Sequence, residues 1–534
     1  LNVIGDREGA VGEDGEVRVP QGFIDAYRKF VEGGWNGVSS DPAFGGMGLP
    51  QLLAAATQEM WQSANMAWAL CPLLTAGAVQ ALTLHGSEEQ KALYLPKLVS
   101  GEWTGTMNLT EPQAGSDLSV VRTRAVPEGD HYRISGQKIF ITWGEHRMAE
   151  NIIHLVLART PDAPEGVKGI SLFIVPKFLL DENGNPGQRN DLRCVSIEHK
   201  LGIHGSPTCT MAFGDAGGAI GYLVGEEGRG LEYMFTMMNE ARHKVGIQGL
   251  AIAERAYQQA RAYARERVQG RPAGYPGGGR GPIIHHPDVR RMLLTMRAAI
   301  EAMRGLAYQA AAHFDFAHRH PDVDVRRAHQ ARADLLIPVV KGWCTELGVE
   351  MASIGVQVHG GMGFIEETGA AQHLRDARIA PIYEGTNGIQ ANDLVGRKVL
   401  RDRGEAMQGL LAELDGIAGN ASNALQAPLR EAIAQLRQAT DWLLEHGAAD
   451  PAAAQANSHH YLMLTGYIIG GALMARAATI ADTALESGSD DVFYHNKIAL
   501  ARFYMQQLLP RAQAHAAAVL AGADAVLELD VEQF

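Results

Sequence analysis

One feature limits the fold of this chain more than any other: a block of short β-branched runs lies between long helical stretches. Between residues 104 and 224 the block contains runs such as Lys138–Thr142, Ile152–Leu157 and Gly169–Val175. No long helical pattern separates these runs, and Pro127–Asp130 has the composition of a hairpin turn. Short strands in direct succession predict a β-sandwich or barrel rather than a doubly wound sheet.

Helical periodicity precedes this block. One pattern begins near Gln21, and a second runs from Pro50 to Leu70 as a single predicted helix. Ser87 is a suitable N-cap for a third helix that ends near Leu98, because its hydroxyl can accept a hydrogen bond from the first turn. Residues 1–20 are rich in Gly, Asp and Glu, so they are predicted to form a loop.

Helical periodicity returns after the block and continues to the end of the chain. Three long patterns cover residues 230–267, 287–316 and 322–358, and a Gly/Pro-rich loop interrupts them at 269–282. From Asp402 the Ala/Leu-rich tail predicts three further helical segments, with breaks at 447–451 and 488–491. The Gly-rich string at 225–230 lacks the Lys-Ser/Thr pair of a phosphate loop, which favours a plain strand-to-helix turn.

Composition excludes several classes of protein. Of the 534 residues, 46% are hydrophobic and 20% are charged, which is typical of globular and not of disordered chains. The formal net charge of −13 disfavours nucleic acid as the main partner. The four cysteines, Cys71, Cys194, Cys209 and Cys344, form no CxxC pair and have no histidine at metal-ligand spacing. We therefore expect no disulfide framework and no metal site, and a reducing, cytoplasmic location.

The longest apolar run covers residues 461–475. It is shorter than the roughly 20 residues that a membrane-spanning helix needs, so we expect a buried core helix and no membrane span. The sequence begins at Leu1 in a polar stretch and has no signal-peptide pattern. We expect that the first helices of an N-terminal helical domain precede Leu1 and are absent from this sequence.

Four polar or glycine-rich strings contain residues suited to chemistry, namely Met107–Asp117, Lys138–Gly144, Gln357–Phe364 and Pro381–Gly388. Each also has a purely structural interpretation. Phe140 and Thr142 would share one face of a strand, because side chains alternate along it, yet a core aromatic beside a surface hydroxyl explains the same pattern. Glu384 lies between an aromatic residue and a glycine. Taken alone, the odds are roughly four to one that it is a solvated surface side chain and not a functional residue.

The order of these strings is more informative than any one of them. Thr-Glu-Pro-x-Ala-Gly-Ser-Asp, Ile-Phe-Ile-Thr, Gln-x-x-Gly-Gly-x-Gly, Arg375–Arg378 and Ile382–Thr386 follow one another at intervals that fit the helix–strand–helix layout. In this respect the chain resembles the acyl-CoA dehydrogenase family of flavoproteins over about residues 20–400. The strings at 32–37 and 286–293 and the extended tail resemble the long form of that family, the 3-methylmercaptopropionyl-CoA dehydrogenase-like group.

The resemblance implies a mainly helical α+β fold with an N-terminal helical domain, a middle β-barrel or sandwich domain, a C-terminal four-helix bundle and an appended helical domain. The corresponding ranges are 1–103, 104–225, 226–400 and 401–534. It implies an FAD-dependent oxidoreductase of fatty acid β-oxidation that removes two hydrogens across Cα–Cβ of an acyl-CoA thioester. It also implies that electrons pass to an electron-transfer flavoprotein, and that the protein is a homodimer because FAD contacts cross between subunits.

Glu384 matches the family's catalytic base, which takes the α-proton while the β-hydride goes to the flavin. Burial between flavin and substrate is expected to raise its pKa towards neutrality. The positions that match flavin contacts within one subunit are Met107, Leu109, Thr110, Phe140, Thr142 and Thr386. The positions that match contacts to the neighbouring subunit's FAD are Arg267, Gln357, Gly360 and Gly361. The positions that match substrate contacts are Ser116, Arg242, Tyr383 and Gly385.

The chain departs from the family pattern in two places. The Arg-x-x-Phe-Gly string that is usual near Arg267 is replaced by Arg267–Arg271 and the long Gly/Pro loop, and a usual Glu or Gln after Thr386 is Gly388. FAD contacts at these ends are therefore expected to differ. Some relatives carry the base at the position of Ala241, and since alanine cannot accept a proton, Glu384 has no rival there.

Other functions on the same scaffold stay open. An acyl-CoA oxidase differs in the access of oxygen to the flavin, and a flavin monooxygenase usually lacks the glutamate found at Glu384. A DNA-binding relative would need a basic tail, whereas residues 402–534 contain 16 acidic and 7 basic residues. Short linear, thioether-containing and long acyl chains all remain open, because one methylene discriminates by only about 1–3 kcal/mol.

Overall fold

The computed structural model describes all 534 residues, and the contacts divide them into two compact units, unit 1 (residues 1–244) and unit 2 (residues 245–534). Unit 1 contains the helices α1 (Asn2–Glu8), α2 (Phe23–Glu32), α3 (Gln51–Ala64), α4 (Met66–His85) and α5 (Glu88–Ser100). Helix α6 (Gly230–Glu266) begins in unit 1 and ends in unit 2. The four domain ranges given above stay a prediction.

The first 20 residues are not the loop that composition predicted. They form α1 and a hairpin of β1 (Val11–Glu13) and β2 (Glu16–Arg18). Asp14 and Gly15 have φ values of +50° and +82°, which is the backbone of the tight turn that an Asp-Gly pair favours between two strands. Val17 is buried in the β core, so packing as well as the turn stabilises the hairpin.

The single helix predicted from Pro50 to Leu70 is in fact two helices, α3 and α4. The chain is extended at Asn65, and the Asn65 side-chain oxygen accepts a hydrogen bond from the Trp68 backbone N–H at 3.0 Å. An Asn side chain competes with the helical backbone and is favoured as an N-cap. The cap predicted at Ser87 is confirmed, since the Gln90 N–H donates to the Ser87 hydroxyl at the start of α5.

Unit 1 is built on an eight-stranded sheet in which most neighbours are antiparallel. Its strands are β3 (Trp103–Asn108), β4 (Arg124–Glu128), β5 (His131–Thr142), β6 (Asn151–Ala158), β7 (Ser171–Pro176), β10 (Leu192–Ile197), β11 (Thr208–Phe213) and β12 (Ala219–Val224), and β8 (Phe178–Leu180) and β9 (Pro186–Arg189) form a separate ribbon. The order is β10-β11-β5-β12-β7-β6-β3, with β4 on β5. Glu128 pairs with His131, which confirms the predicted hairpin turn.

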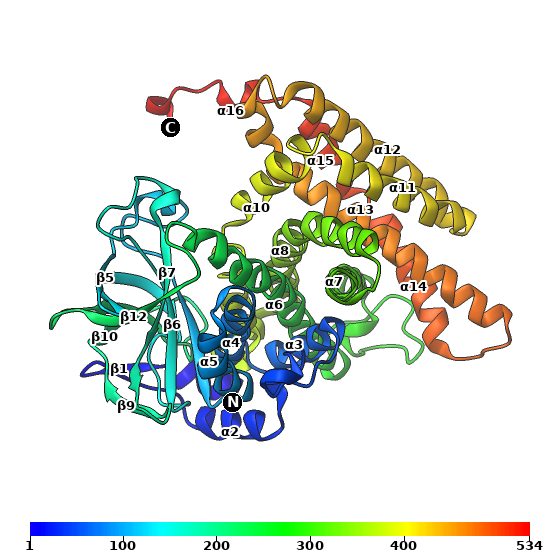
Figure 1. Cartoon of the computed structure of the whole chain (residues 1–534). Coiled ribbons are helices and arrows are strands. Elements are labelled where there is room, and N and C mark those ends of the chain that lie inside the picture. The colour runs from blue at the N-terminus through cyan, green and yellow to red at the C-terminus, as the bar shows by residue number, and fades with distance from the viewer. The chain divides into compact units, whose positions relative to one another are not determined.

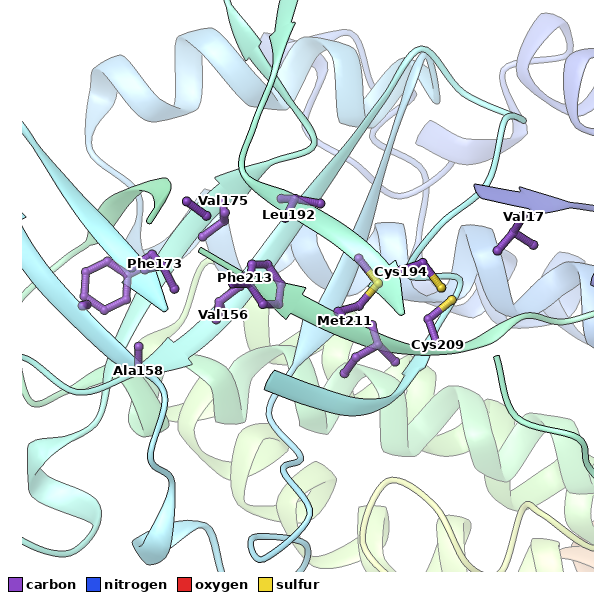
Figure 2. Packing of buried hydrophobic residues seen from close by; sticks show 14 residues of the cluster. Val17, Val156, Ala158, Phe173, Val175, Leu192, Cys194, Cys209, Met211 and Phe213 are labelled. Carbon is purple, nitrogen blue, oxygen red and sulfur yellow. The ribbon is translucent and has the colours of Figure 1, made fainter. Parts of the chain in front are cut away.

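The core of this sheet is made of inward-facing side chains from several strands. Figure 2 shows Val156, Phe173, Val175 and Phe213 gathered between the strands, and each is at most 1% exposed. Burial of one such side chain contributes about 1.5–3 kcal/mol relative to exposure. The β region is a half-barrel with helices at its flank, as predicted, and not a doubly wound sheet.

Unit 2 is helical. Its long helices α7 (Pro287–Arg319) and α8 (Val323–His359) pack against each other (Figure 1). The short helices α9 (Ala370–Ala377) and α10 (Asn387–Asp393) follow, and α10 continues as the π-helix η8 (Leu394–Leu400). The predicted Gly/Pro-rich loop separates α6 from α7, and a bridge between Val268 and Pro282 closes its base.

The tail adds α11 (Glu405–Asn420), α12 (Asn423–His446), α13 (Pro451–Glu486), α14 (Val492–Gln507), α15 (Arg511–Leu520) and the short α16 (Asp524–Leu527). The predicted breaks at 447–451 and 488–491 are confirmed, but three segments were too few. Additional breaks fall at 421–422 and 508–510. They are short interruptions in an Ala-rich sequence, and only Pro510 gives a clear local signal, because proline lacks the backbone N–H.

Two helices, α4 and α13, are long and apolar enough to span a membrane by length and composition alone. Inside the protein, 78% of the most apolar window of α4 and 72% of that of α13 are buried. Both are therefore core helices, and the core helix predicted at 461–475 is confirmed as part of α13.

Candidate active site

Strand β5 carries a β-bulge at the predicted flavin-facing residue. Cys209 of β11 pairs with Ile141, but two residues further Met211 pairs with Lys138, so β5 has one extra residue here. Phe140, inside the bulge, has a φ of +59°. For a residue other than glycine this left-handed backbone costs about 1–2 kcal/mol. Bulges re-aim side chains and are frequent beside active sites.

The bulge turns an aromatic ring away from the core. Phe140 is 58% exposed, whereas Lys138 before it and Ile141 after it are buried. Thr142, the last residue of β5, is half-buried, so Phe140 and Thr142 both lie off the core face, but the bulge and not regular alternation places Phe140 there, since Lys138 two residues earlier is buried. An exposed, oriented phenyl face beside a hydroxyl can stack on and hydrogen-bond to a flat heteroaromatic ligand.

The predicted residues Met107, Leu109 and Thr110 lie at the end of β3 and directly after it. The Thr110 carbonyl oxygen accepts a hydrogen bond from the Ile139 N–H at 2.9 Å, which ties this segment to the bulge. Leu109 is buried, and Thr110 and Met107 are half-buried. The structure therefore brings Leu109, Thr110, Phe140 and Thr142 to one place in unit 1.

A buried ion pair between Lys138 and Glu111 supports the segment that contains Leu109 and Thr110. Lys138 Nζ donates to Glu111 Oε1 at 2.8 Å and to the Leu109 carbonyl oxygen at 3.0 Å. Lys138 and Glu111 side chains are 0% and 3% exposed. Glu111 also accepts hydrogen bonds from the Thr123 hydroxyl and from the Arg122 and Thr123 backbone N–H groups. Both charged groups are thus paired and hydrogen-bonded, which a buried charge requires.

The environment of this pair shifts both pKa values. Burial by itself would raise the pKa of Glu111, but the ammonium of Lys138 and the hydrogen bonds from Lys138 and Thr123 lower the pKa to about 2. Burial lowers the pKa of Lys138 to about 8, opposed by the charge of Glu111. At neutral pH both groups are charged, so the pair is a salt bridge.

Two further predicted residues of unit 1 lie elsewhere. Ser116 is exposed in the turn after the Glu111–Ala114 bridge. Arg242, on α6, is 6% exposed, and its guanidinium donates to Asn239 Oδ1 at 3.2 Å. Both residues therefore come from segments other than β3, β5 and the residues directly after β3.

The Tyr383–Thr386 loop of unit 2 joins α9 to α10. Glu384 and Gly385 have φ values of +57° and +83°, so two consecutive residues are left-handed. The Thr386 hydroxyl accepts a hydrogen bond from the Ile389 N–H at 3.2 Å and caps α10. The Tyr383 phenol donates to Gln248 Oε1 on α6. Burial raises the pKa of Tyr383, and the nearby charge of Glu384 raises it further, so the phenol stays a donor.

Asn387, the first residue of α10, anchors this loop to α8. Its N–H donates to the Pro381 carbonyl oxygen at 2.9 Å, which closes the loop. Its side-chain oxygen accepts a hydrogen bond at 2.8 Å from Nζ of Lys341, which is 0% exposed. Its amide nitrogen donates to Glu346 Oε1 at 2.8 Å. The predicted residues Tyr383, Glu384, Gly385 and Thr386 are therefore part of one anchored loop.

The remaining predicted residues lie at one end of the unit 2 helices. The ring of Tyr263 at the end of α6 lies 4.6 Å from the ring of His359 at the end of α8, measured between centroids. Arg267 follows the first helix end. Gln357, Gly360 and Gly361 are at the second, and all four are exposed. Gly360 has a φ of +61°, which suits glycine.

Sequence reasoning missed two fully buried lysines, Lys138 and Lys341, each of which is 0% exposed. The signal was available in part, because Lys138 is flanked by Ile139 and Lys341 follows two valines. A lysine in an apolar run is almost never fully buried without a partner. The partner of Lys341 is 46 residues away along the chain, so no local pattern identifies it.

Four family models match consecutive parts of the chain. The N-terminal, middle and C-terminal domain models of acyl-CoA dehydrogenase match residues 10–102, 106–216 and 228–399. A model described as acetyl-CoA dehydrogenase C-terminal like matches residues 406–530. Each part of the chain, the tail included, therefore has a counterpart in known proteins.

Individual proteins are similar over nearly the full length. The 3-methylmercaptopropionyl-CoA dehydrogenase of Ruegeria pomeroyi is 53% identical over 99% of this chain and 90% of its own length. A butyryl-CoA dehydrogenase of Syntrophomonas wolfei is 37% identical over 93% of this chain and 84% of its own length. The structure of an acyl-CoA dehydrogenase complexed with FAD from Bacillus anthracis has the same fold, with a TM-score of 0.75, 24% identity and coverage of 93% of this chain and 82% of that one.

A second solved structure, Caenorhabditis elegans ACDH-11 in complex with C11-CoA, has a TM-score of 0.76 at 23% identity and covers 94% of this chain and 83% of that one. The mainly helical α+β fold expected from the resemblance is confirmed by this likeness. Family models that together span most of the chain and a relative 53% identical along 99% of it lead to one conclusion. The chain belongs to the acyl-CoA dehydrogenase family of FAD-dependent oxidoreductases.

Proposed function

We propose that this acyl-CoA dehydrogenase uses Glu384 as the general base that removes the α-proton of an acyl-CoA thioester, and that the product is a trans-2-enoyl-CoA. A carboxylate can take up the proton directly, and a positioned base contributes about 10²–10⁴-fold to such a step. Glu384 stands in the loop that joins two short helices of unit 2, where a side chain can be presented without breaking a helix.

The conformation of Glu384 carries this proposal. Its left-handed backbone, with a φ of +57°, is strained for a glutamate. Such a conformation is kept only where contacts with the surrounding structure enforce it. Tyr383 is fixed by its hydrogen bond to Gln248, and Thr386 is fixed as the cap of α10. The chain is therefore fixed on both sides of Glu384, which supports a base that must meet a C–H bond in one geometry.

The residues of unit 1 fit the flavin of FAD. Phe140 offers an exposed aromatic face, and Thr110 and Thr142 offer half-buried hydroxyls that donate or accept hydrogen bonds. We propose that these residues, with Met107 and Leu109, line the flavin. When bound, FAD supplies the two-electron acceptor that no protein side chain provides.

The end of unit 2 fits the phosphate and adenosine part of a second subunit's FAD. Arg267 is an exposed cation, and Gly360 and Gly361 have no atom within 4 Å of where a side chain would begin. Beside them Phe364 is 83% exposed and Met362 is 51% exposed. Exposed apolar side chains of this size mark interaction surfaces. We propose that this end, with Gln357, forms part of a homodimer interface.

We propose a short acyl-CoA as the substrate, and the thioether 3-(methylthio)propanoyl-CoA as the first compound to test. The support is the 53% identity to the Ruegeria pomeroyi enzyme, against 37% for the Syntrophomonas wolfei butyryl-CoA dehydrogenase. The proposed substrate contacts are Ser116, Arg242, Tyr383 and Gly385. We further propose that an electron-transfer flavoprotein accepts the electrons, and a cytoplasmic location, which the four buried, unpaired cysteines support.

An anaerobic absorbance titration of the FAD-reconstituted chain tests the substrate proposal. The panel contains 3-(methylthio)propanoyl-CoA, butyryl-CoA and a long-chain acyl-CoA. Bleaching of the oxidised flavin band by the thioether at the lowest concentration is the expected result. Equal bleaching by all three would contradict the thioether preference but not the dehydrogenase reaction.

Two other outcomes point to different functions. A flavin that binds and is never bleached by an acyl-CoA would favour the monooxygenase or DNA-binding alternatives. Rapid reoxidation of the bleached flavin by dissolved oxygen would favour an oxidase over a dehydrogenase that transfers electrons to a flavoprotein.

A further inference from the structure

Helix α10, which follows the Glu384 loop directly, is enclosed by two longer helices of unit 2. It packs against α8 on one side and against α13 of the tail on another. Its last residues continue into the π-helix η8, which also packs against α13. A π-helix is rare and is frequently found near functional sites. The tail is therefore in contact with the segment that carries the proposed base.

The contact with α8 lies at the first residue of α10. Asn387 is 5% exposed, and its side-chain amide bridges Lys341 and Glu346, at 2.8 Å to each. Thr345, which is fully buried, adds a third polar contact at 3.0 Å. A rotation of this amide would break its hydrogen bonds to a cation and to a carboxylate in a buried place. The start of α10 is thereby fixed.

The contact with the tail lies near the end of the same helix. Ser458 of α13 is 3% exposed, and its hydroxyl oxygen is 2.8 Å from Asn392 Oδ1 of α10 and 2.8 Å from the Gln455 carbonyl oxygen. The hydroxyl has one proton, so it donates to one of these acceptors at a time. Without α13, Asn392 Oδ1 would lose the buried Ser458 hydroxyl as a hydrogen-bond donor.

Close helix packing holds α13 in position against α8. A Cβ atom added to Gly466 of α13 would lie 2.2 Å from Cγ of Trp343 on α8, and one added to Gly342 would lie 2.7 Å from Leu462. The two backbones can approach this closely only because these positions are glycines. Trp343 is 0% exposed, so the contact is part of the core. The tail is not a loosely attached addition to unit 2.

Helix α10 in turn contacts the backbone of the base. Gln390 is 0% exposed, and its Nε2 lies 3.4 Å from the carbonyl oxygens of Glu384 and Gly385. These are the two consecutive left-handed residues. A small rotation or shift of α10 would move Gln390, and with it the contacts to the backbone that carries the Glu384 side chain.

We propose that the tail is part of the active-site scaffold, and that Ser458 is a positioning residue that acts on Glu384 through Asn392 and helix α10. Lys341 performs the same task at the opposite end of α10. This inference rests on the proposed role of Glu384 as the base. It assigns to the tail a direct contribution to the rate of proton removal, in addition to its contribution to stability.

The test compares Ser458→Ala, Asn392→Ala and the double variant with the FAD-loaded wild type. A misplacement of 1 Å costs on the order of 100-fold in rate. Loss of one hydrogen bond should displace Glu384 by less than this, so the rate of flavin bleaching at saturating acyl-CoA is expected to fall about tenfold in each single variant. The concentration of acyl-CoA at half-maximal rate should change little. The double variant should be no slower than either single variant, because both changes remove the same contact.

Two further variants separate positioning from general destabilisation. Asn392→Asp keeps an oxygen that accepts from Ser458 and should retain most of the rate. Ser422→Ala removes a hydroxyl from an exposed position at the start of α12, where the side chain caps nothing, and should leave the rate unchanged. Thermal unfolding of every variant shows whether the fold is kept, and Asn392→Ala, at a half-buried position, serves if Ser458→Ala does not fold.

Unchanged bleaching rates in both single variants, or a double variant that is about 100-fold slower, would overturn the proposal. If no acyl-CoA bleaches the wild-type flavin, the proposed function fails, and amide hydrogen exchange of the resting protein decides this inference by itself. Peptides that cover residues 383–393 should exchange faster in Ser458→Ala than in the wild type and in Ser422→Ala. Equal exchange in these peptides would overturn it.

Discussion

The two parts of the candidate site share one structural feature, a left-handed residue supported by a buried lysine, in different surroundings. In unit 1, Phe140 has a left-handed backbone within a β-bulge, and in unit 2, Glu384 has one within a helix-connecting loop. A fully buried lysine supports each of them, Lys138 in the first case and Lys341 in the second. In both cases, strain at a candidate site residue is accompanied by a buried polar contact close by.

The difference lies in the partner of each lysine. Lys138 contacts the carboxylate of Glu111 directly, at 2.8 Å. Lys341 donates a hydrogen bond to the neutral amide of Asn387, and the same amide donates one to the carboxylate of Glu346. A direct buried ion pair loses several kcal/mol when one partner is removed, whereas a hydrogen bond from an ammonium to an amide loses about 1–3 kcal/mol. The strand that carries Phe140 is therefore the more rigid support, and the loop that carries Glu384 the more adjustable one.

Removing the proposed base is expected to have the largest effect. Glu384→Gln keeps the size of the side chain but cannot accept the α-proton, so flavin bleaching by acyl-CoA should slow by about 10²–10⁴-fold. Stopped-flow absorbance measures this rate, and the FAD spectrum checks that the cofactor is bound. Glu367→Gln, at an exposed position in unit 2, is the matched control. Near-normal bleaching in Glu384→Gln would show that another group is the base.

Removing the carboxylate of the ion pair should give the largest loss of stability. Glu111→Gln leaves the ammonium of Lys138 buried without a counter-charge, at a cost of about 3–5 kcal/mol. Lys341→Met should cost less, because it removes a hydrogen bond to the neutral amide of Asn387, at about 1–3 kcal/mol. Urea unfolding at a fixed FAD concentration measures both. Equal losses would refute the contrast between the two supports, and Glu111→Gln combined with Lys138→Met should recover part of the loss.

The same ion pair gives an acid dependence of stability. The pKa of Glu111 is about 2 in the folded protein, below its ordinary value of 4.5. The unfolded chain then binds more protons, so this contribution is complete above about pH 4.5 and is lost as the pH falls towards 2. Glu111→Gln should show a shallower fall in unfolding free energy over this interval than the wild type. Parallel curves would argue against the shift.

The smallest expected effects concern Phe140. Phe140→Ala should weaken FAD binding about tenfold, because aromatic stacking of this kind contributes about 0.5–1.5 kcal/mol. Phe140→Gly loses the same ring but relieves the left-handed strain of about 1–2 kcal/mol. The FAD-free Gly variant should therefore be more stable than the FAD-free Ala variant. FAD fluorescence titration and urea unfolding measure the two effects, and equal stabilities would mean that the bulge is not strained.

Much of the fold could be predicted because the signals are local. The Ser87 cap depends on a hydrogen bond three residues away, and the Gly129-Asp130 turn depends on neighbouring backbone angles. Where prediction failed, the local signal was weak or ambiguous. Asn65 divides one apparent helix into two, and the Asp14-Gly15 turn was hidden in a stretch that composition assigned to a loop.

By itself, the sequence determined the order of helices and strands, the β block between helices, and the strings that contain Glu384 and Phe140. The tertiary structure alone decided which of these residues are strained and what supports them. Lys138 meets Glu111 across 27 residues, and Ser458 meets Asn392 across 66. The stability of such contacts depends on how completely they are removed from water, and that burial exists only once distant parts of the chain have packed together.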